Sequence, residues 1–238
     1  SLRLLRRIET RIDLRERLGL DGPRQTPAGP VFWVHGASNG ELTSARPFLE
    51  TLLKREPRLR IVVTTNSTTG RDMVRRWALP RVGTRLAPLD YRLCLRAFLA
   101  SHHPSTLILL EGDFWPNRID MTANTGATLA MVSARMSKGS FRKWSRWPRL
   151  TKSLMQRIDL LSAQDADAQA RYISLGVSER AVAAPFNLKT TVSLAAPDAE
   201  ELTTFQSHYT RDNTLLAAST HPGEEEQILA AYCNAQNK

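Results

Sequence analysis

Short apolar runs alternate with stretches of helical spacing through most of the chain. The runs predict buried strands at 31–35, 60–65, 84–89, 106–110, 128–133, 160–163 and 181–185. Apolar positions at helical spacing lie between them, for example at 42–54 and 91–100. Strands and helices that alternate through short loops form βαβ units. We therefore expect an α/β fold whose doubly wound parallel sheet is covered by helices on both faces.

The two ends of the chain depart from this alternation. Residues 2–18 place leucine and isoleucine at helical spacing opposite a row of arginines, a pattern typical of a basic amphipathic helix. Such a helix either lies on an anionic membrane surface or packs its apolar stripe on the domain. Near the other end, 197–209 predicts a connecting helix, and 214–219 predicts a strand followed by a helix from Pro222.

These patterns predict three segments. Residues 1–30 are expected to form a basic helix and a linker, 31–190 the α/β domain, and 191–238 the connecting helix and the start of a second, incomplete α/β domain. One strand and one helix are too few to build a sheet with a core. The second domain is therefore expected to stop early or to dock on the first.

The chain is strongly basic, since 33 Lys and Arg residues against 23 Asp and Glu residues give a formal net charge of +10. This favours an anionic partner, such as a phosphate, a lipid headgroup or a nucleic acid. Cys94 and Cys233 lie far apart, a pattern that indicates neither a disulfide framework nor a zinc site and is typical of a reducing compartment. No run approaches the ~20 apolar residues that span a bilayer, so membrane contact is expected to be peripheral or to lie outside this chain.

Residues 31–42 join an apolar strand to a helix through a turn of small residues that includes Ser38 and Gly40, and Glu41 stands at the head of the helix. Ligands in open α/β sheets bind beyond the carboxyl ends of the strands, where helix N-termini present free N–H groups. Glu41 is therefore a candidate for chemistry. The alternative is an ordinary acidic residue in a first helical turn, which the helix dipole favours.

Five further stretches follow predicted strands. The hydroxyl-rich loop 64–70, which contains Thr65, suits hydrogen bonding to an oxyanion or a sugar hydroxyl, although helix capping explains it equally well. The loop 111–117 places carboxylates beside a buried strand, where they need partners or a wet cleft. Its candidate residues are Glu111, Asp113, Trp115 and Asn117.

Cations follow two more predicted strands. Arg135 and Lys189 each stand at a strand end, where they can hold an anionic substrate group. The last stretch joins a predicted strand to a helix N-terminus and has the geometry of an anion site. Its candidate residues are Ser219, Thr220, His221 and Glu224, of which the histidine is open to a purely structural reading.

Six motifs in this order resemble the 3-deoxy-D-manno-octulosonic acid (Kdo) transferases of lipopolysaccharide synthesis. They occupy residues 35–41, 64–70, 111–117, 133–137, 187–189 and 219–225. The resemblance covers nearly all of the chain from Asp13 onward. It implies a GT-B glycosyltransferase whose Rossmann-like N-terminal domain receives a lipid A precursor and whose C-terminal domain binds CMP-Kdo. It also implies a peripheral enzyme at the cytoplasmic face of the inner membrane that uses neither metal nor cofactor.

The resemblance also implies roles for individual residues. Glu41 is expected to be the general base, with Glu111 or Asp113 orienting the acceptor or raising the proton affinity of the base. The expected acceptor-binding residues are Ser38, Gly40, Thr65, Asp113, Trp115, Asn117, Arg135 and Lys189. The expected donor-binding residues are Ser219, Thr220, His221 and Glu224.

Some positions depart from the family pattern. Asn39 stands where the family commonly has Val, and Phe186 where it commonly has Gly before Asn-Leu-Lys, at the hinge toward the second domain. The chain has Gly-Asp-Phe at 112–114 where the family has Thr-Glu-Leu, so the acidic position is kept. The later motifs that complete the nucleotide pocket are expected beyond Lys238.

Two other function classes stay open on the residues alone. One is a non-catalytic or partial domain that binds the anionic lipid acceptor. The other is a nucleic-acid binder, suggested by the net charge and by the alternation of basic and aromatic residues in Phe141–Trp147. The same stretch suits the interfacial belt of a lipid-handling enzyme, so we expect no nucleic-acid partner.

Two expectations concern geometry. The loops after 31–35 and 106–110 are expected to lie side by side, because a doubly wound sheet forms its crevice where the strand order reverses. Basic side chains are expected to gather near the mouth of that cleft, on the side that meets the membrane. They are Arg135, Lys138, Arg142, Lys143 and Arg146.

Overall fold

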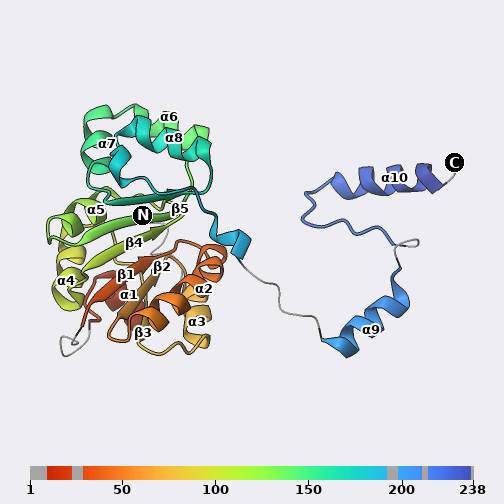
Figure 1. Cartoon of the computed structure of the whole chain (residues 1–238). Coiled ribbons are helices and arrows are strands. Elements are labelled where there is room, and N and C mark those ends of the chain that lie inside the picture. Colours follow the sequence, from red (N-terminus) through yellow and green to blue (C-terminus); the bar gives the residue numbers. More distant parts are fainter. Residues whose placement is uncertain (1–9, 23–28, 192–197, 211–213, 237–238) are drawn as a thin grey trace. The chain divides into compact units, whose positions relative to one another are not determined.

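A computed structural model describes residues 10–22, 29–191, 198–210 and 214–236 of the chain. The chain divides into two compact units, Ser1–Val192 and Ser193–Lys238 (Figure 1). The first unit holds a parallel sheet with helices on both faces. In the second, the described residues form two helices, α9 (Ala199–His208) and α10 (Glu224–Gln236).

The sheet of the first unit has six strands in the order β3-β2-β1-β4-β5-β6, and every neighbouring pair is parallel. The strands are β1 (Val31–His35), β2 (Arg60–Thr65), β3 (Val82–Leu86), β4 (Thr106–Leu110), β5 (Thr128–Ala134) and β6 (Leu160–Ala163). This order runs outward in both directions from β1 and β4, which is the doubly wound Rossmann arrangement. The predicted fold class is confirmed.

Helices connect the strands. They are α1 (Arg11–Arg17), α2 (Asn39–Arg55), α3 (Thr68–Arg76), α4 (Arg92–His102), α5 (Pro116–Ala123), α6 (Lys138–Ser145), α7 (Pro148–Met155) and α8 (Ala166–Leu175). Two short 3₁₀ helices follow, η1 (Glu179–Ala181) and η2 (Leu188–Thr191). The predicted spacings at 42–54 and 91–100 correspond to α2 and α4.

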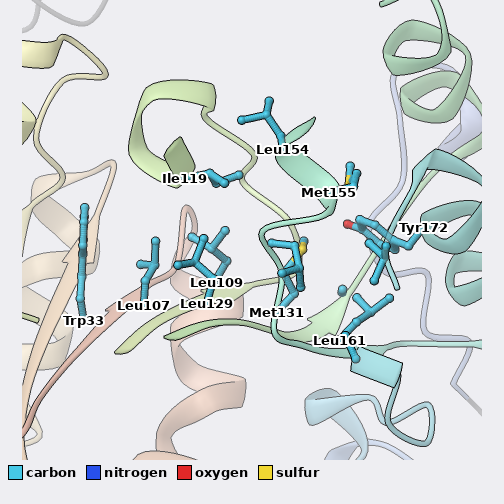
Figure 2. Packing of buried hydrophobic residues seen from close by; sticks show 14 of the residues in the cluster. Trp33, Leu107, Leu109, Ile119, Leu129, Met131, Leu154, Met155, Leu161 and Tyr172 are labelled. Carbon is cyan, nitrogen blue, oxygen red and sulfur yellow. The ribbon is translucent and has the colours of Figure 1, made fainter. Parts of the chain in front are cut away.

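Each face of the sheet has its own apolar layer, because side chains alternate between the faces along a strand. On one face, α4, α5, α7 and α8 cover strand residues such as Trp33 and Leu107. Figure 2 shows this layer, which extends to the fully buried Met131. On the other face, α2 and α3 cover Val34 and Ile108. Burial on both faces explains why these strands are almost continuously apolar in sequence.

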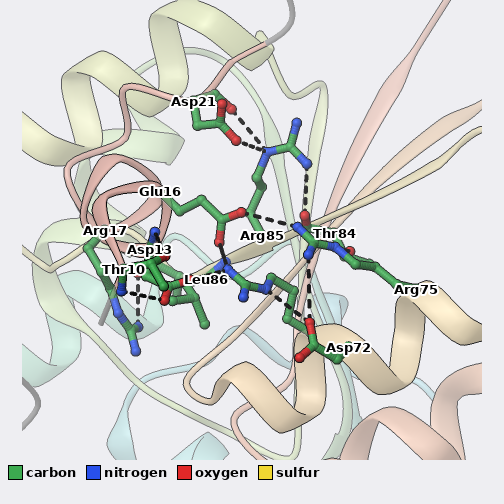
Figure 3. A network of polar contacts seen from close by, with 12 residues as sticks. Thr10, Asp13, Glu16, Arg17, Asp21, Asp72, Arg75, Thr84, Arg85 and Leu86 are labelled. Atoms are coloured by element: carbon green, nitrogen blue, oxygen red, sulfur yellow. Dashed lines mark hydrogen bonds and ion pairs between the residues drawn. The ribbon is translucent and has the colours of Figure 1, made fainter. Parts of the chain in front are cut away.

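Helix α1 packs against β3 at the edge of the sheet through charged side chains. Asp13 and Glu16 are buried, and Arg71 of α3 forms ion pairs with both of them. Figure 3 shows this network, in which the Glu16 carboxylate also accepts a hydrogen bond of 2.8 Å from the Leu86 backbone N–H. The ion pairs offset the cost of taking these carboxylates out of water.

In the part that the structure describes, the helix predicted at 2–18 is present as α1, but its predicted apolar and basic faces are wrong. Ile12 of the expected apolar stripe is 61% exposed, whereas Arg17 of the expected basic face is buried. Arg17 is held by backbone carbonyls, with Nη1 donating to Ala87 and Nη2 to Asn66. Residues 1–9, which complete the predicted helix, lie outside the described residues.

Two predicted strands differ from the structure because of prolines. β3 ends at Leu86 rather than at residue 89, since Pro88 has no N–H for the ladder and the Leu89 N–H donates to the Arg17 carbonyl. The segment 181–185 contains the last residue of η1 and a single bridge between Val182 and Leu161 instead of a strand. Pro185 again interrupts the row of donors.

The predicted strand at 214–219 is also wrong, because these residues have no regular secondary structure. A strand needs a neighbour for its backbone groups, and the described residues of the second unit provide none. The two helices predicted around it are confirmed as α9 and α10.

Candidate functional site

A cleft of about 440 Å³ opens at the carboxyl ends of β1, β4 and β5. It is lined by Ala37, Glu41, Glu111, Gly112, Asp113, Arg135, Ser137 and Ser140. β1 and β4 are neighbours in the sheet, with His35 opposite Leu109, and the strand order reverses between them. The structure therefore confirms that the loops after these two strands lie side by side, at the place where open α/β sheets bind ligands.

Glu41 enters the cleft from the first turn of α2. Ser38 is the N-cap of this helix and accepts a hydrogen bond from the Glu41 N–H at 3.3 Å. In return, the Glu41 carboxylate accepts hydrogen bonds from the Ala37 N–H at 2.7 Å and from the Ser38 hydroxyl at 3.0 Å. This reciprocal cap fixes the carboxylate at the cleft wall.

The pKa of Glu41 is raised above its usual value. Burial is the main cause, and the negative charges of Glu111 and Asp113 act in the same direction. The two hydrogen bonds that the carboxylate accepts oppose the shift without cancelling it. A carboxylate with a raised pKa is a stronger base, which is what proton abstraction requires.

Glu111 follows β4 in a backbone conformation that is rare for a residue with a side chain, with φ of 53°. The turn continues through Gly112 at φ of 106° and is held where the Arg135 N–H donates to the Glu111 carbonyl at 3.0 Å. The Glu111 carboxylate forms an ion pair of 2.8 Å with Lys189 of η2. Two predicted site residues that are far apart in the sequence are thus paired.

Asp113 is the most heavily hydrogen-bonded carboxylate of the cleft. It accepts hydrogen bonds from His35 Nε2 at 2.7 Å, Trp115 Nε1 at 2.8 Å and Asn66 Nδ2 at 3.1 Å. Burial opposes its charge, but these donors and the nearby Arg118 guanidinium hold the pKa of Asp113 well below its usual range. Asp113 is therefore a fixed negative charge rather than a proton carrier.

A directional chain of hydrogen bonds reaches Asp113 from the core. Trp33 Nε1 donates to the Thr64 hydroxyl at 2.8 Å, and that hydroxyl is 2.9 Å from His35 Nδ1. The hydroxyl proton is thus directed to Nδ1, which leaves His35 Nε2–H to donate to Asp113. Burial and the charge of Arg118 lower the pKa of His35 to about 4, so the imidazole is neutral at pH 7.

Arg135 supplies positive charge to the lining of the cleft. Its side chain is exposed, and among the described residues no carboxylate forms an ion pair with it. Ser137 and Ser140 lie beside it, where Ser137 caps the N-terminus of α6. An anionic group that enters the cleft meets a cation, two hydroxyls and a helix N-terminus.

Other predicted site residues lie outside the cleft lining. Gly40 is exposed in the first turn of α2. Thr65 is buried at the end of β2, and its hydroxyl has no hydrogen-bond partner in the part of the chain that the structure describes. Asn117 donates its side-chain amide to the Asp90 carbonyl at 2.7 Å. Trp115 is 40% exposed and lines a separate pocket. The roles predicted for these residues stay predictions.

Three residues that the sequence did not single out support the site. His35 and Asn66 hold Asp113, and Arg118 lies 3.9 Å from the same carboxylate. His35 and Asn66 belong to the motifs at 35–41 and 64–70. Their position at strand ends could have identified them as candidate site residues. Arg118 lies in an amphipathic helix, where a fully buried arginine has no sequence signal.

The sequence that forms the cleft matches a known family. The family model for 3-deoxy-D-manno-octulosonic-acid transferase (kdotransferase) matches residues 12–192, which include every residue that lines the cleft. The chain belongs to the Kdo transferase family.

Relatives of this family resemble the chain over most of its length. It is 30% identical over 216 residues to a 3-deoxy-D-manno-octulosonic acid transferase of Chlamydophila psittaci, covering 90% of this chain and 50% of that protein. It is 27% identical over 220 residues to the enzyme of the same name in Haemophilus influenzae, covering 92% and 52%. The chain thus spans about half the length of these curated relatives.

Solved structures share the fold at low sequence identity. A crystal structure of UDP-N-acetylglucosamine 2-epimerase matches with a TM-score of 0.50 and 16% identity, over 72% of this chain and 53% of that one. A second 2-epimerase, from Listeria monocytogenes, matches with the same TM-score and 18% identity. These neighbours share their fold with this Kdo transferase family member, which is of the GT-B type.

The predicted donor-binding residues of this family member belong to the second unit and make local contacts. The His221 N–H donates to the Glu224 carboxylate at 2.8 Å, and the Thr220 hydroxyl donates to Glu225. Ser219 precedes them with φ of 58°. These contacts cap α10, and the predicted donor contacts stay predictions.

The basic side chains predicted near the cleft mouth are all exposed. Arg135 lines the cleft, and Lys138, Arg142 and Lys143 lie on α6, whose N-terminal serines line it too. None of the helices in the described ranges combines the length and apolarity needed to cross a membrane. Within those ranges, no cluster of three or more His, Cys, Asp or Glu side chains is placed to hold a metal ion.

Proposed function

We propose that this chain is the acceptor-binding part of a glycosyltransferase that moves Kdo from CMP-Kdo to a lipid A precursor. The observation that carries the proposal is the cleft in which Glu41 and Glu111 lie together with Arg135, in a chain of the Kdo transferase family. The cleft offers a base for a hydroxyl and a cation for an anionic acceptor.

Glu41 is the general base in this proposal. It accepts the proton of the acceptor hydroxyl while the hydroxyl oxygen forms a bond to the anomeric carbon of Kdo. The bond between that carbon and the phosphate oxygen of CMP breaks, and CMP leaves with the electron pair. Attack opposite the leaving group inverts the configuration, so one carboxylate base is sufficient and no enzyme nucleophile is required. The raised pKa of Glu41 supports this role.

Glu111 and Asp113 do not accept the proton in this proposal. They affect the pKa of Glu41 and orient the acceptor. Their negative charges contribute to the raised pKa of Glu41. Lys189 pairs with Glu111 and orients its carboxylate, while the hydrogen bonds from His35 and Asn66 do the same for Asp113. In this role the two acids accept hydrogen bonds from acceptor hydroxyls.

Arg135 and the exposed face of α6 bind anionic lipid in this proposal. Arg142, Lys143 and Arg146 are exposed together with Trp147, which is 65% exposed. Tryptophan and arginine side by side suit the headgroup level of a bilayer. The protein would then work peripherally at the cytoplasmic face of the inner membrane, without a metal.

A transfer assay tests the proposal. A chain extended to the full length of the family is incubated with CMP-Kdo and a lipid A precursor, with and without EDTA, and products are measured by mass spectrometry. We expect Kdo-bearing lipid in both samples, and acceptor binding without transfer by the 238-residue chain alone. Absence of Kdo-bearing lipid, while the extended chain binds the acceptor, would leave only the non-catalytic alternative.

A further inference from the structure

A second pocket, of about 160 Å³, adjoins the hydrogen-bond partners of Asp113. It is lined by Arg17, Asn66, Ala87, Pro88, Leu89, Asp90, Tyr91, Trp115 and Arg118. Trp115 and Asn66 both donate to Asp113, which itself lines the cleft. The pocket and the cleft are therefore linked through Asp113 and its donors. The volume corresponds to about five water molecules at roughly 30 Å³ each.

Arg118 is the unusual residue of this pocket. It is 2% exposed, yet its Nε and Nη1 atoms have no hydrogen-bond partner among the described residues. Its nearest charge is Asp113, where Nη1 and Oδ2 are 3.9 Å apart, which is too far for a hydrogen bond. Buried donors of a charged group without acceptors are costly. Because Arg118 lines the pocket, an acceptor that enters it lies beside this guanidinium.

The carboxylates in and beside the pocket, Asp90 in its lining and Asp113 in the neighbouring cleft, are already engaged. The Asp90 carboxylate accepts hydrogen bonds from the Asn117 and Arg118 backbone N–H groups, at 3.1 and 2.8 Å, and thereby caps α5. Asp113 has three donors of its own. Arg17 adds a second positive charge to the lining. The Arg17 guanidinium already donates to the Ala87 and Asn66 carbonyls, so Arg118 is the residue whose donors the carboxylates do not satisfy.

The mouth of the pocket carries two aromatic rings. Tyr91 is 58% exposed and Trp115 is 40% exposed, and both line the pocket. Exposed aromatic faces beside polar donors are suited to a sugar ring, whose C–H groups pack against the ring while its substituents form hydrogen bonds.

We propose that this pocket binds the phosphate group of a sugar phosphate, with the Arg118 guanidinium as its cation and the sugar ring lying against Trp115 and Tyr91. The choice of ligand rests on the proposed function, in which a phosphorylated sugar lipid is the acceptor. The pocket then holds one end of the acceptor while its hydroxyl reaches the cleft beyond Asp113.

Calorimetric titration of the 238-residue chain with glucose 6-phosphate, inorganic phosphate and glucose tests this proposal. We expect both phosphates to bind and glucose not to. Arg118→Met is expected to weaken the binding of both phosphates at least about tenfold, because hydrogen bonds from a charged group are lost. Arg96→Met is the matched control, because it removes one charge from an exposed position on α4 and is expected to leave binding unchanged.

Two results overturn the proposal: phosphate binding by Arg118→Met that equals the wild type, or no phosphate binding by the wild type at millimolar concentration. If circular dichroism shows that Arg118→Met is unfolded, Tyr91→Ala decides. This variant is expected to bind glucose 6-phosphate more weakly than the wild type does, and to bind inorganic phosphate equally well. If it binds both ligands as tightly as the wild type, the proposed pocket is refuted. Since the titration involves no donor sugar, its failure leaves the transferase proposal standing, and a failed transfer assay does not alter its result.

Discussion

Asp113 shows how much of the site depends on single buried residues. Its charge is maintained by a neutral histidine, and the histidine is kept neutral by burial and by Arg118. The chain from Trp33 through Thr64 and His35 fixes which imidazole nitrogen carries the proton. Protonation of His35 would remove the acceptor at Nδ1 and place a charge in the core.

This leads to a prediction for stability against pH. His35 and His102 are both buried, and both have their pKa lowered from 6.5 to about 4. The unfolded chain binds protons to these histidines between pH 6.5 and 4, and the folded chain does not, so stability falls as the pH falls through this window. Each histidine contributes up to roughly 3 kcal/mol. Urea unfolding at a series of pH values measures the loss.

Variants separate this effect from general acid unfolding. His102 lies in α4, away from the cleft. His102→Asn is expected to reduce the dependence of the unfolding free energy on pH between pH 4 and 6.5 by about half, because only one of the two histidines that bind a proton on unfolding remains. His208→Asn, at an exposed position in α9, is expected to leave the slope as it is. A wild-type stability that is constant across this window would contradict the assigned protonation states.

At the scale of elements, α1 is held to the sheet by charge rather than by apolar packing. Arg71→Met is expected to destabilise the first unit by on the order of 3 kcal/mol, because it leaves the buried carboxylates of Asp13 and Glu16 without their shared cation. Chemical denaturation gives the free energy of unfolding. Arg76→Met, exposed on the same helix, is the control and is expected to cost less than about 0.5 kcal/mol. Equal losses in the two variants would show that the network contributes nothing specific.

The same helix shows where sequence reasoning stops. The strands of the sheet were predictable because burial on both faces makes them continuously apolar, and their order at β1 and β4 brought Glu41 and Glu111 together as expected. The burial of Asp13 and Glu16 depends on Arg71, which is distant in the sequence, and a local pattern does not reveal it. The ion pair of Glu111 with Lys189 is long-range in the same way.

At the scale of the whole molecule, the two units differ in how they bury residues. The first has apolar layers on both faces of its sheet, whereas no described residue from 198 onward is buried. The proposed acceptor site lies within the first unit, so acceptor binding is testable without the remainder of the family's length. The proposed donor contacts of the second unit require that remainder.

The basic surface gives a prediction at this scale. Replacing Arg142, Lys143 and Arg146 by Ser is expected to weaken binding to anionic vesicles about 100-fold, since each cation near such a surface contributes about 1 kcal/mol. Vesicle co-sedimentation at fixed ionic strength measures this. The control replaces Lys54, Arg55 and Arg58 by Ser, which removes the same charge at the end of α2 and the loop before β2. Equal losses in both variants would mean that net charge, and not this surface, drives binding.

The transfer rate of Glu41→Gln in a chain of full family length tests the central claim most directly. The substitution keeps size and hydrogen bonding but removes the ability to accept a proton, so single-turnover transfer from CMP-Kdo is expected to fall by roughly 10²–10⁴-fold with acceptor binding retained. Glu50→Gln, which loses only the exposed pair with Arg46 on the same helix, is expected to keep the wild-type rate. If Glu41 only caps α2, its variant loses about 0.3–1 kcal/mol of stability and keeps the full rate, and that result would contradict the account.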